Sequence, residues 1–304
     1  MKQLICGTTA YRTFSNDAAG GRLSHAYMLH FNDVKNLREA LKIFALRFFG
    51  LTEENGRRIL NESFTDCRIF PEEGKKLTAD AVAALLADSI LKPLECDRKL
   101  YIISGFEQTT QLLQNKLLKT LEEPPQGVHF LLGVTSPAPV LDTVKSRVKT
   151  LVVPPFTEEQ IYAALRRKDA ANPLNRAAAE SCGGIFGAAE NMVKGGWFAE
   201  IAEAAREICA VRDAAAAGRA AVKYGDTKYK NELLAQMGLN YRNALCRIAR
   251  GGGSDVTAAA LTYAAEAVDK AVSDVKFNAF FQGLLFDLML RIIEENDRWL
   301  KLQA

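Results

Sequence analysis

The sequence predicts an α/β fold in which a parallel sheet lies between two layers of helices, followed by segments that are helical throughout. Over residues 1–153, short apolar runs alternate with longer stretches of helical periodicity, and such alternation is typical of a parallel sheet. Several runs are continuously apolar, which suits strands buried on both faces. After Pro154-Pro155 no convincing strand pattern follows, so the rest of the chain is expected to be all-α.

Five strands and four helices are expected before residue 154. The strands are expected at residues 26–30, 65–70, 99–104, 128–134 and 149–153, and the helices at 34–49, 78–91, 107–122 and 140–145. The helix at 107–122 repeats leucine at positions 113, 117 and 121, with Leu112 and Leu118 beside that stripe. Pro124-Pro125 ends it, because proline lacks an N–H and disfavours helix in the residue before it.

Changes of pattern divide the 304 residues into three expected domains, at residues 1–153, 154–196 and 197–304, a number that suits the length. The middle domain begins with Thr157 and Gln160, which have the spacing of a helix capping box. In the last domain, the C-terminal helix carries a wide apolar stripe, which is expected to form mostly the core of its own bundle. The stripe consists of Phe277, Phe280, Phe281, Leu284, Leu285, Leu288, Met289, Ile292 and Ile293.

Composition bounds the class of protein. Apolar residues make up 48% of the chain and charged residues 25%, which is the profile of a globular domain. A net charge of +3 neither demands nor excludes nucleic acid. The sequence has no apolar run of the length that spans a membrane, about 18 residues, and no signal-peptide pattern at its start, so a cytoplasmic location is expected.

Cysteine spacing gives no indication of a metal site. The two cysteines nearest in sequence, Cys182 and Cys209, lie 27 positions apart, so no C-x-x-C ligand pair exists. Neither a bound metal nor a disulfide is expected, and the six cysteines are expected to be buried free thiols in a reducing compartment.

Three segments in the first 153 residues carry a family resemblance. They are residues 21–29, residues 99–107, and a leucine-rich run at 115–125 that continues into Leu141-Asp-Thr-Val-Lys-Ser-Arg147. In this order and spacing they resemble the bacterial clamp-loader subunits of the AAA+ class. The resemblance implies a RecA-like α/β domain at 1–153, a helical lid at 154–196 and a helical collar for oligomerisation at 197–304.

The phosphate-binding loop of the family has lost its functional residues here. ATP-binding relatives read G-x-x-x-x-G-K-[ST], and the aligned run in this chain is Phe31-Asn-Asp-Val-Lys-Asn-Leu-Arg38. Phe31 and Asn36 replace the glycines, Leu37 replaces the lysine, and Arg38 replaces the hydroxyl residue. The loop works because glycines let backbone N–H groups close around phosphate, while lysine supplies charge and the hydroxyl holds magnesium. Phe31 would fill the space that the phosphates need.

Two further elements that bind nucleotide in ATP-binding relatives also lack their functional residues in this chain. The strand at 99–104 resembles the Walker B strand, but Ser104 and Gly105 stand where hydrolysing relatives carry acids. Glu107 lies two positions too late, and it is interpreted as an acid favoured by a helix N-terminus. Ala188 stands where the lid of ATP-binding relatives carries a basic sensor residue. No nucleotide, magnesium or other cofactor is therefore expected.

One functional motif of the family is retained. Ser146-Arg147 matches the family's S-R-C motif, with Val148 in place of the cysteine. In the family this arginine reaches the ATP of the neighbouring subunit, a role that suits an always-protonated side chain with a fork of donors. The resemblance therefore implies that Arg147 is an arginine finger acting in trans, with Ser146 as part of the supporting motif. The alternative is an ordinary arginine in a surface ion pair.

The resemblance favours the delta-prime type of subunit, a member of the DNA polymerase III clamp loader that is not itself an enzyme. Its implied partners are the ATP-binding gamma/tau subunits and the delta subunit and, through the complex, the sliding clamp and primed DNA. Two alternatives stay open: the clamp-opening delta subunit, and an active AAA+ ATPase with an atypical loop. Residues 51–63 contain no cysteine, so the four-cysteine zinc module of many delta-prime subunits is not expected.

Overall fold

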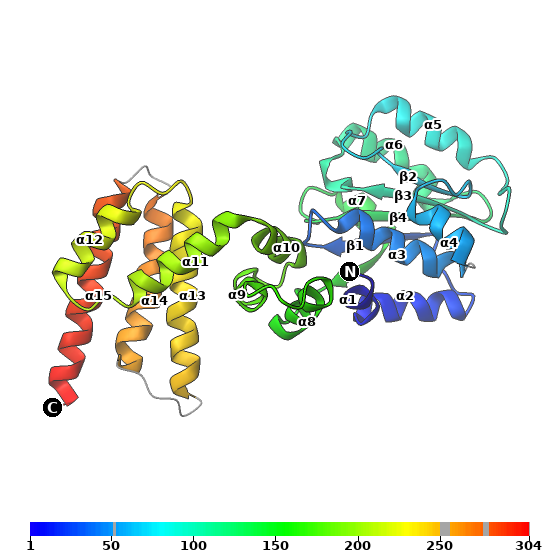
Figure 1. The fold of residues 1–304 in the computed structure, drawn as a ribbon. Coiled ribbons are helices and arrows are strands. Elements are labelled where there is room, and N and C mark those ends of the chain that lie inside the picture. Colours follow the sequence, from blue (N-terminus) through cyan, green and yellow to red (C-terminus); the bar gives the residue numbers. More distant parts are fainter. Residues whose placement is uncertain (51–52, 250–255, 276–279, 304) are drawn as a thin grey trace. The chain divides into compact units, whose positions relative to one another are not determined.

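The computed structural model describes residues 1–50, 53–249, 256–275 and 280–303. It divides into two compact units, which are described separately (Figure 1). Met1–Lys168 and Gly184–Ala188 form the first, and Asp169–Gly183 and Ala189–Ala304 form the second. The domain boundaries expected at 153/154 and 196/197 stay a prediction.

A five-stranded parallel sheet forms the centre of the first unit, in the order β2-β3-β4-β1-β5. Its strands are β1 (Ala26–Phe31), β2 (Cys67–Phe70), β3 (Lys99–Ser104), β4 (Val128–Val134) and β5 (Lys149–Val153). The register places Met28 of β1 between Leu132 of β4 and Thr150 of β5. The predicted parallel sheet is confirmed, and three of its strands have the predicted bounds.

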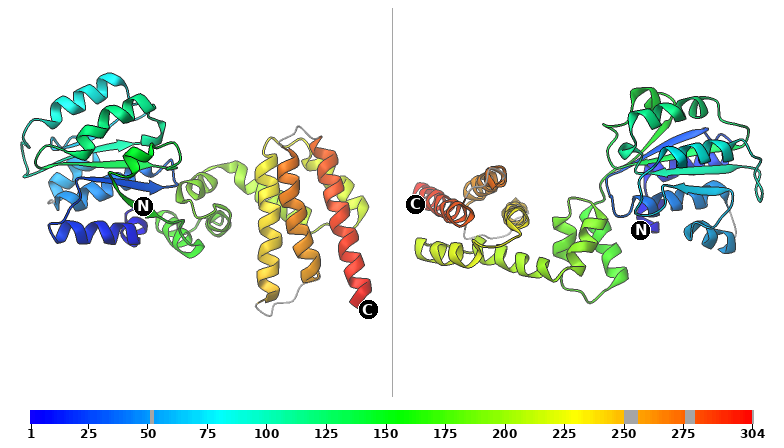
Figure 2. Two further views of the ribbon diagram at one scale, coloured as in Figure 1. Left: turned by 180° about the vertical axis from the view of Figure 1, so that it is seen from behind. Right: turned by 90° about the horizontal axis from the view of Figure 1, so that it is seen from above.

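Helices cover both faces of this sheet, as Figures 1 and 2 show. One face packs against α5 (Ala79–Ser89) and α6 (Gln111–Glu122) through a core that includes Val82, Leu117 and Phe130. The other face packs against α3 (Leu37–Phe49), and α2 (Thr9–Ala19) lies beside α3. The predicted α/β fold, with a parallel sheet between two layers of helices, is thereby confirmed.

The helix predicted at 107–122 is wrong at its start. Phe106–Gln108 forms a separate 3-10 turn, η1, and α6 begins only at Gln111. Between them Thr109 and Thr110 are in extended conformation, which β-branched residues favour. Three helices that the pattern did not single out are also present: α1 (Lys2–Cys6), α2 and α4 (Glu53–Leu60). The short helix expected near 140–145 is α7 (Asp142–Lys145).

The capping box predicted after β5 is confirmed. At the start of α8 (Glu158–Lys168), the Gln160 amide N–H donates to the Thr157 hydroxyl across 3.2 Å, and the Thr157 amide N–H donates to the Gln160 side chain across 2.9 Å. This reciprocal pair satisfies two N–H groups that the first turn of a helix leaves without partners. No strand follows β5 in the described part of the chain.

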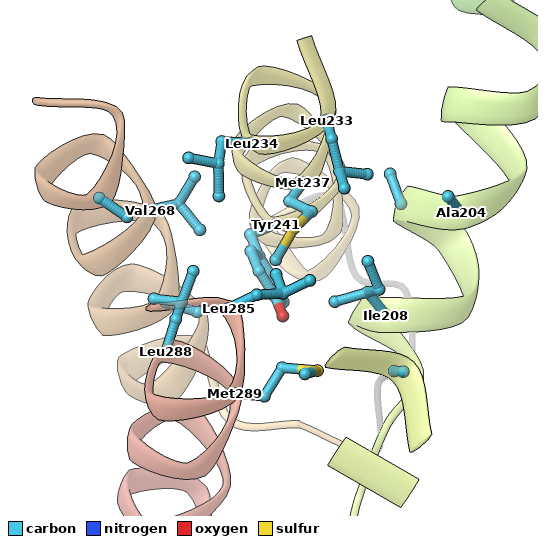
Figure 3. Close-up of a cluster of buried hydrophobic side chains, with 14 of the residues drawn as sticks. Ala204, Ile208, Leu233, Leu234, Met237, Tyr241, Val268, Leu285, Leu288 and Met289 are labelled. Atoms are coloured by element: carbon cyan, nitrogen blue, oxygen red, sulfur yellow. The ribbon is translucent and has the colours of Figure 1, made fainter. Parts of the chain in front are cut away.

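The second unit consists of helices around a core of its own. It contains α9 (Asn175–Ser181) and the part of α10 (Phe186–Lys194) after Ala188, since the first residues of α10 belong to the first unit. These are followed by α11 (Gly196–Cys209), α12 (Ala214–Tyr224), α13 (Lys230–Ala249), α14 (Ala258–Val275) and α15 (Phe281–Gln303). Figure 3 shows side chains from α11, α13, α14 and α15 meeting in this core. Leu285, Leu288 and Met289 of the predicted stripe are buried in it. Phe280 is wrong as a core residue, because it precedes α15 and is 74% exposed. Phe277 lies outside the described residues.

The expectation that all six cysteines are buried free thiols holds only in part. All six cysteines are free, but only Cys67 and Cys182 are buried, and Cys246 is exposed on α13. Among the described residues, no cluster of three or more His, Cys, Asp or Glu side chains has the arrangement of a metal site, and no helix is long and apolar enough to cross a membrane.

Candidate functional site

The loop between β1 and α3 has a buried apolar side chain at each end. Phe31 is buried at the end of β1, where its ring meets the edge of Phe156 with 6.0 Å between centroids. Leu37 is buried as the first residue of α3. In nucleotide-binding loops the corresponding positions are a glycine and the phosphate-binding lysine. Here both of these positions belong to the hydrophobic core.

A buried carboxylate lies inside the same loop. Asp33 is 1% exposed. Its Oδ1 accepts the backbone N–H of Asn36 across 3.2 Å, and its Oδ2 accepts the Asn36 side-chain amide across 2.9 Å. Oδ2 also accepts the backbone N–H of Gly187, at the start of α10, across 2.8 Å. The sequence analysis did not single out Asp33, because its donors include a residue 154 positions away.

Arg38, at the position of the magnesium-binding hydroxyl, is held by an acid. Its Nε donates to Glu62 Oε1 across 2.7 Å, its Nη2 pairs with Glu62 Oε2, and its Nη1 donates to the Pro71 carbonyl across 2.9 Å. Lys42 also pairs with Glu62, at 2.8 Å. Hydrogen bonds from Arg38 and then Lys42 lower the pKa of Glu62 to about 2. Arg38 is thus engaged within its own fold.

At the end of β3, Ser104 and a glycine with positive φ occupy the two positions where the sequence analysis expected no acid. Gly105 follows Ser104 with φ 71°, a left-handed conformation that residues other than glycine rarely adopt. Glu107 lies in the 3-10 turn, and its Oε1 accepts the Thr135 hydroxyl across 2.6 Å and the Thr135 backbone N–H across 3.1 Å. The sequence predicts that Glu107 is an acid at the N-terminus of a helix starting at residue 107, whereas the structure places it in η1, before α6 begins, with its carboxylate bound to Thr135.

A small cavity remains between these elements. It has a volume of about 240 Å³ and is bordered by Lys35, Leu37, Arg38, Ser104 and Gly105, among others. Small-molecule pockets usually measure about 300–1,000 Å³.

Ala188, which the sequence analysis placed at the position of the lid's basic sensor residue, lies within α10 directly after Gly187 and is partly exposed.

Arg147 lies at the surface of the first unit, just after α7. Its side chain is 31% exposed, and Nε is 3.2 Å from Glu122 Oε2, at the C-terminal end of α6. Nη2 donates to Glu122 Oε1 across 3.3 Å, and Nη1 donates to the Thr143 carbonyl across 2.9 Å and to the Ser146 hydroxyl across 3.3 Å. Val148 packs at the edge of the sheet's core. The guanidinium is therefore neither buried in the fold nor detached from it.

The structure separates the predicted residues into two places. Phe31 and Asn36 belong to the segment from the end of β1 to the start of α3, and Leu37 and Arg38 line one cavity with Ser104 and Gly105. Ser146 and Arg147 lie beside the end of α6. Sequence reasoning missed the acids Asp33, Glu62 and Glu122. For Glu122 a signal existed, since the run Leu-Glu-Glu-Pro-Pro marks a helix end that carries acids.

Comparisons with known proteins find similarity to subunits of DNA polymerase III. Residues 7–157 match the family model described as DNA polymerase III, delta subunit. A DNA polymerase III subunit delta' of Bacillus subtilis is 30% identical over 183 residues, which cover 58% of this chain and 56% of that one. The delta' subunit of Yersinia pestis is 30% identical over 151 residues, covering 45% and 44%. A solved gamma subunit-related protein of Thermotoga maritima aligns over 89% of this chain and 94% of its own, with 16% identity and a TM-score of 0.40.

The parallel sheet with helices on both faces makes the first unit an α/β domain, and the second unit consists of helices. The chain spans about half the length of the curated delta' relatives that it matches. The family match and these relatives make the chain similar to the delta-prime subunits of DNA polymerase III.

Proposed function

We propose that this chain is a non-hydrolysing subunit of a DNA polymerase III clamp loader, which lends Arg147 to the ATP site of a neighbouring subunit. The observation that carries the proposal is a contrast between two places in one domain. The loop that binds phosphate in ATP-binding relatives has the buried apolar residues Phe31 and Leu37 at its two ends, while the side chain of the motif arginine stays partly exposed, at 31%.

Several features support the absence of a nucleotide site of its own. No lysine stands at the position now held by Leu37, and the guanidinium of Arg38 is engaged by Glu62 and Pro71. The left-handed Gly105 leaves no acid at the end of β3 for magnesium. The cavity of about 240 Å³ is small for a nucleoside triphosphate, since drug-sized ligands fill about 300–1,000 Å³.

The surroundings of Arg147 suit a role in trans. An arginine finger stabilises charge on the departing phosphate and works through its planar fork of donors. The present partner, Glu122, is 55% exposed, and exposed ion pairs contribute only about 0–1 kcal/mol. The guanidinium can therefore exchange Glu122 for an anionic phosphate at small cost.

The proposed partners follow from the family. Relatives of this chain include the gamma and tau subunits of DNA polymerase III, such as the tau subunit of Escherichia coli at 29% identity over 159 residues. We infer that an ATP-binding subunit of this type receives Arg147, with a delta subunit in the same ring and the sliding clamp and primed DNA as its substrates. In such a cyclic assembly each subunit has a donor and a receptor face.

The experiment is an Arg147→Ala substitution in a loader reconstituted with its gamma-type and delta subunits. Arginine fingers contribute about 10³- to 10⁵-fold to a single site, so turnover at the neighbouring site should nearly cease, and total DNA-stimulated hydrolysis should fall by the share of that site. Assembly, measured by size-exclusion chromatography, should be unchanged.

Arg68→Ala is the matched control, because Arg68 is also exposed and ion-paired, with Asp88 at 3.4 Å in the same unit. The control loader should hydrolyse ATP at the wild-type rate. Normal hydrolysis by the Arg147→Ala loader would refute the finger role.

The alternative of an active ATPase has a direct test of its own. Calorimetric titration of the isolated chain with ATP and magnesium should give no binding. Micromolar, magnesium-dependent affinity would overturn the proposal that this subunit binds no nucleotide.

A further inference from the structure

The buried Asp33 carboxylate connects the loop before α3 to the start of α10, and the Asn36 N–H that it accepts also donates to the Asp33 backbone carbonyl across 3.1 Å. The carboxylate accepts two backbone N–H groups, from Asn36 and Gly187, and the side-chain amide of Asn36, at 2.8–3.2 Å. Backbone amides at the start of a helix form such concave anion sites. Asp33 itself is 1% exposed, and a buried charge is stable only when hydrogen-bonded or paired.

The donors come from the two elements that a nucleotide phosphate connects in ATP-binding relatives. Asn36 occupies the position of the second glycine of the phosphate-binding loop, whose amide faces phosphate. Gly187 directly precedes Ala188, at the aligned position of the lid's sensor residue. In this chain one side-chain carboxylate connects both elements.

The packing at Gly187 leaves space for the carboxylate and for little else. A Cβ atom built on Gly187 would lie 2.3 Å from Asp33 Oδ1 and 2.8 Å from the Asn36 side-chain nitrogen. Both distances are shorter than van der Waals contact, so the backbone of residue 187 approaches Asp33 as closely as only glycine allows.

We propose that the Asp33 carboxylate is the permanent internal ligand of an anion-binding site at the start of α3, and that it fastens residues 184–188 to the loop without a nucleotide. The Asp33 carboxylate thus occupies a site that also lacks the family's phosphate-binding residues. A phosphate would have to displace this buried carboxylate from its three hydrogen-bond donors. This inference deepens the proposed absence of ATP binding, and it does not depend on the role of Arg147.

The first test measures hydrogen exchange of the Gly187 amide in the full chain, with the amide signal assigned by triple-resonance NMR of the isotope-labelled protein. Wild-type Gly187 should be protected. In Asp33→Ala, and in the isosteric Asp33→Asn, exchange should be about 10- to 100-fold faster, as expected when a hydrogen bond to a charged group is lost.

The matched control is Asp66→Asn. Asp66 is equally buried in the same unit, and its carboxylate accepts the backbone N–H groups of Leu94, Glu95 and Cys96 at 2.7–2.8 Å. This variant should lose stability without faster exchange at Gly187. Comparing the Asp33 variants with Asp66→Asn distinguishes loss of the local contact to Gly187 from a general loss of stability. If Asp33→Ala does not fold, the exchange measurement is made on Asp33→Asn alone.

The second test adds inorganic phosphate to Asp33→Ala, against sodium chloride at the same ionic strength. Phosphate should enter the vacated site, slow the exchange of Gly187 and raise the melting temperature, while wild type should respond equally to both salts. Unchanged exchange of the Gly187 amide in both Asp33 variants would overturn the proposal.

Exchange of the Gly187 amide that is faster in Asp33→Ala but is not slowed by phosphate would overturn the assignment of an anion site. ATP binding by wild type would contradict the proposed function, whereas these outcomes address Asp33 alone.

Discussion

The guanidinium of Arg147 lies against the carboxylate of Glu122, with Nε 3.2 Å from Oε2 and Nη2 donating to Oε1 across 3.3 Å. The pair joins the last turn of α6 to the residue that follows the cap of α7. Nε is at ion-pair distance without hydrogen-bond alignment. The contact therefore holds the arginine at the surface without fixing all its donors.

From this contact we predict that Glu122→Ala has a much smaller effect than Arg147→Ala. An ion pair as exposed as this one contributes at most about 1 kcal/mol, so ATP hydrolysis by the reconstituted loader should change by less than about fivefold. Arg147→Lys, which keeps the charge but loses the fork, should be nearly as impaired as Arg147→Ala. If Glu122→Ala abolished hydrolysis as fully as Arg147→Ala, the carboxylate would be an essential positioning group.

A second prediction concerns acid stability. Arg38 and Lys42 lower the pKa of Glu62 from its ordinary 4.5 to about 2, so the folded state favours the ionised carboxylate. The resulting stability is fully present above pH 4.5 and is lost as the pH falls toward 2. Glu62→Gln should lower the free energy of unfolding at neutral pH by about 1–3 kcal/mol, and its deficit should shrink below pH 4.5.

Urea denaturation at a series of pH values measures this difference. Glu73→Gln, at an exposed glutamate, is the control and should follow the wild-type curve. Parallel curves for wild type and Glu62→Gln would show that Arg38 and Glu62 are not coupled in the folded protein.

A third prediction compares two leucines of α6. Leu117 is buried in the core under the sheet, whereas Leu112 is 68% exposed. Leu117→Ala should lower the free energy of unfolding by about 2–5 kcal/mol, and Leu112→Ala should change it by no more than about 0.5 kcal/mol. Chemical denaturation followed by circular dichroism measures both. Equal losses would mean that α6 presents a different face to the sheet.

A fourth prediction tests the close approach of α3 to the sheet. A Cβ atom on Gly133 would lie 2.5 Å from Leu41 Cδ1, and Leu41 is completely buried. Gly133→Ala should therefore cost about 1–3 kcal/mol through overpacking. Combined with Leu41→Ala, which removes the obstructing methyl groups, the same substitution should cost less. Additive effects in this double-mutant cycle would exclude the steric conflict.

Local patterns were sufficient to predict most of the first unit. The strands at 99–104, 128–134 and 149–153 have their predicted bounds, because continuous apolar runs reflect burial on both faces. The capping box of Thr157 and Gln160 was readable because both partners lie within one helical turn. The break before α6 could not be predicted in this way, because helical periodicity continues through Thr109-Thr110 although the backbone there is extended.

The sequence by itself was enough to predict the similarity to clamp-loader subunits and the α/β fold, and it shows that residues 31–38 contain no glycine, all of which depend on residue types at fixed local spacing. Only the tertiary structure decided which charges meet. Asp33 reaches Gly187 across 154 positions, Arg38 reaches Glu62 across 24, and Arg147 reaches Glu122 across 25. Such pairs leave no periodic signal, because their partners come together only when the packing of separate strands and helices fixes the distances between side chains.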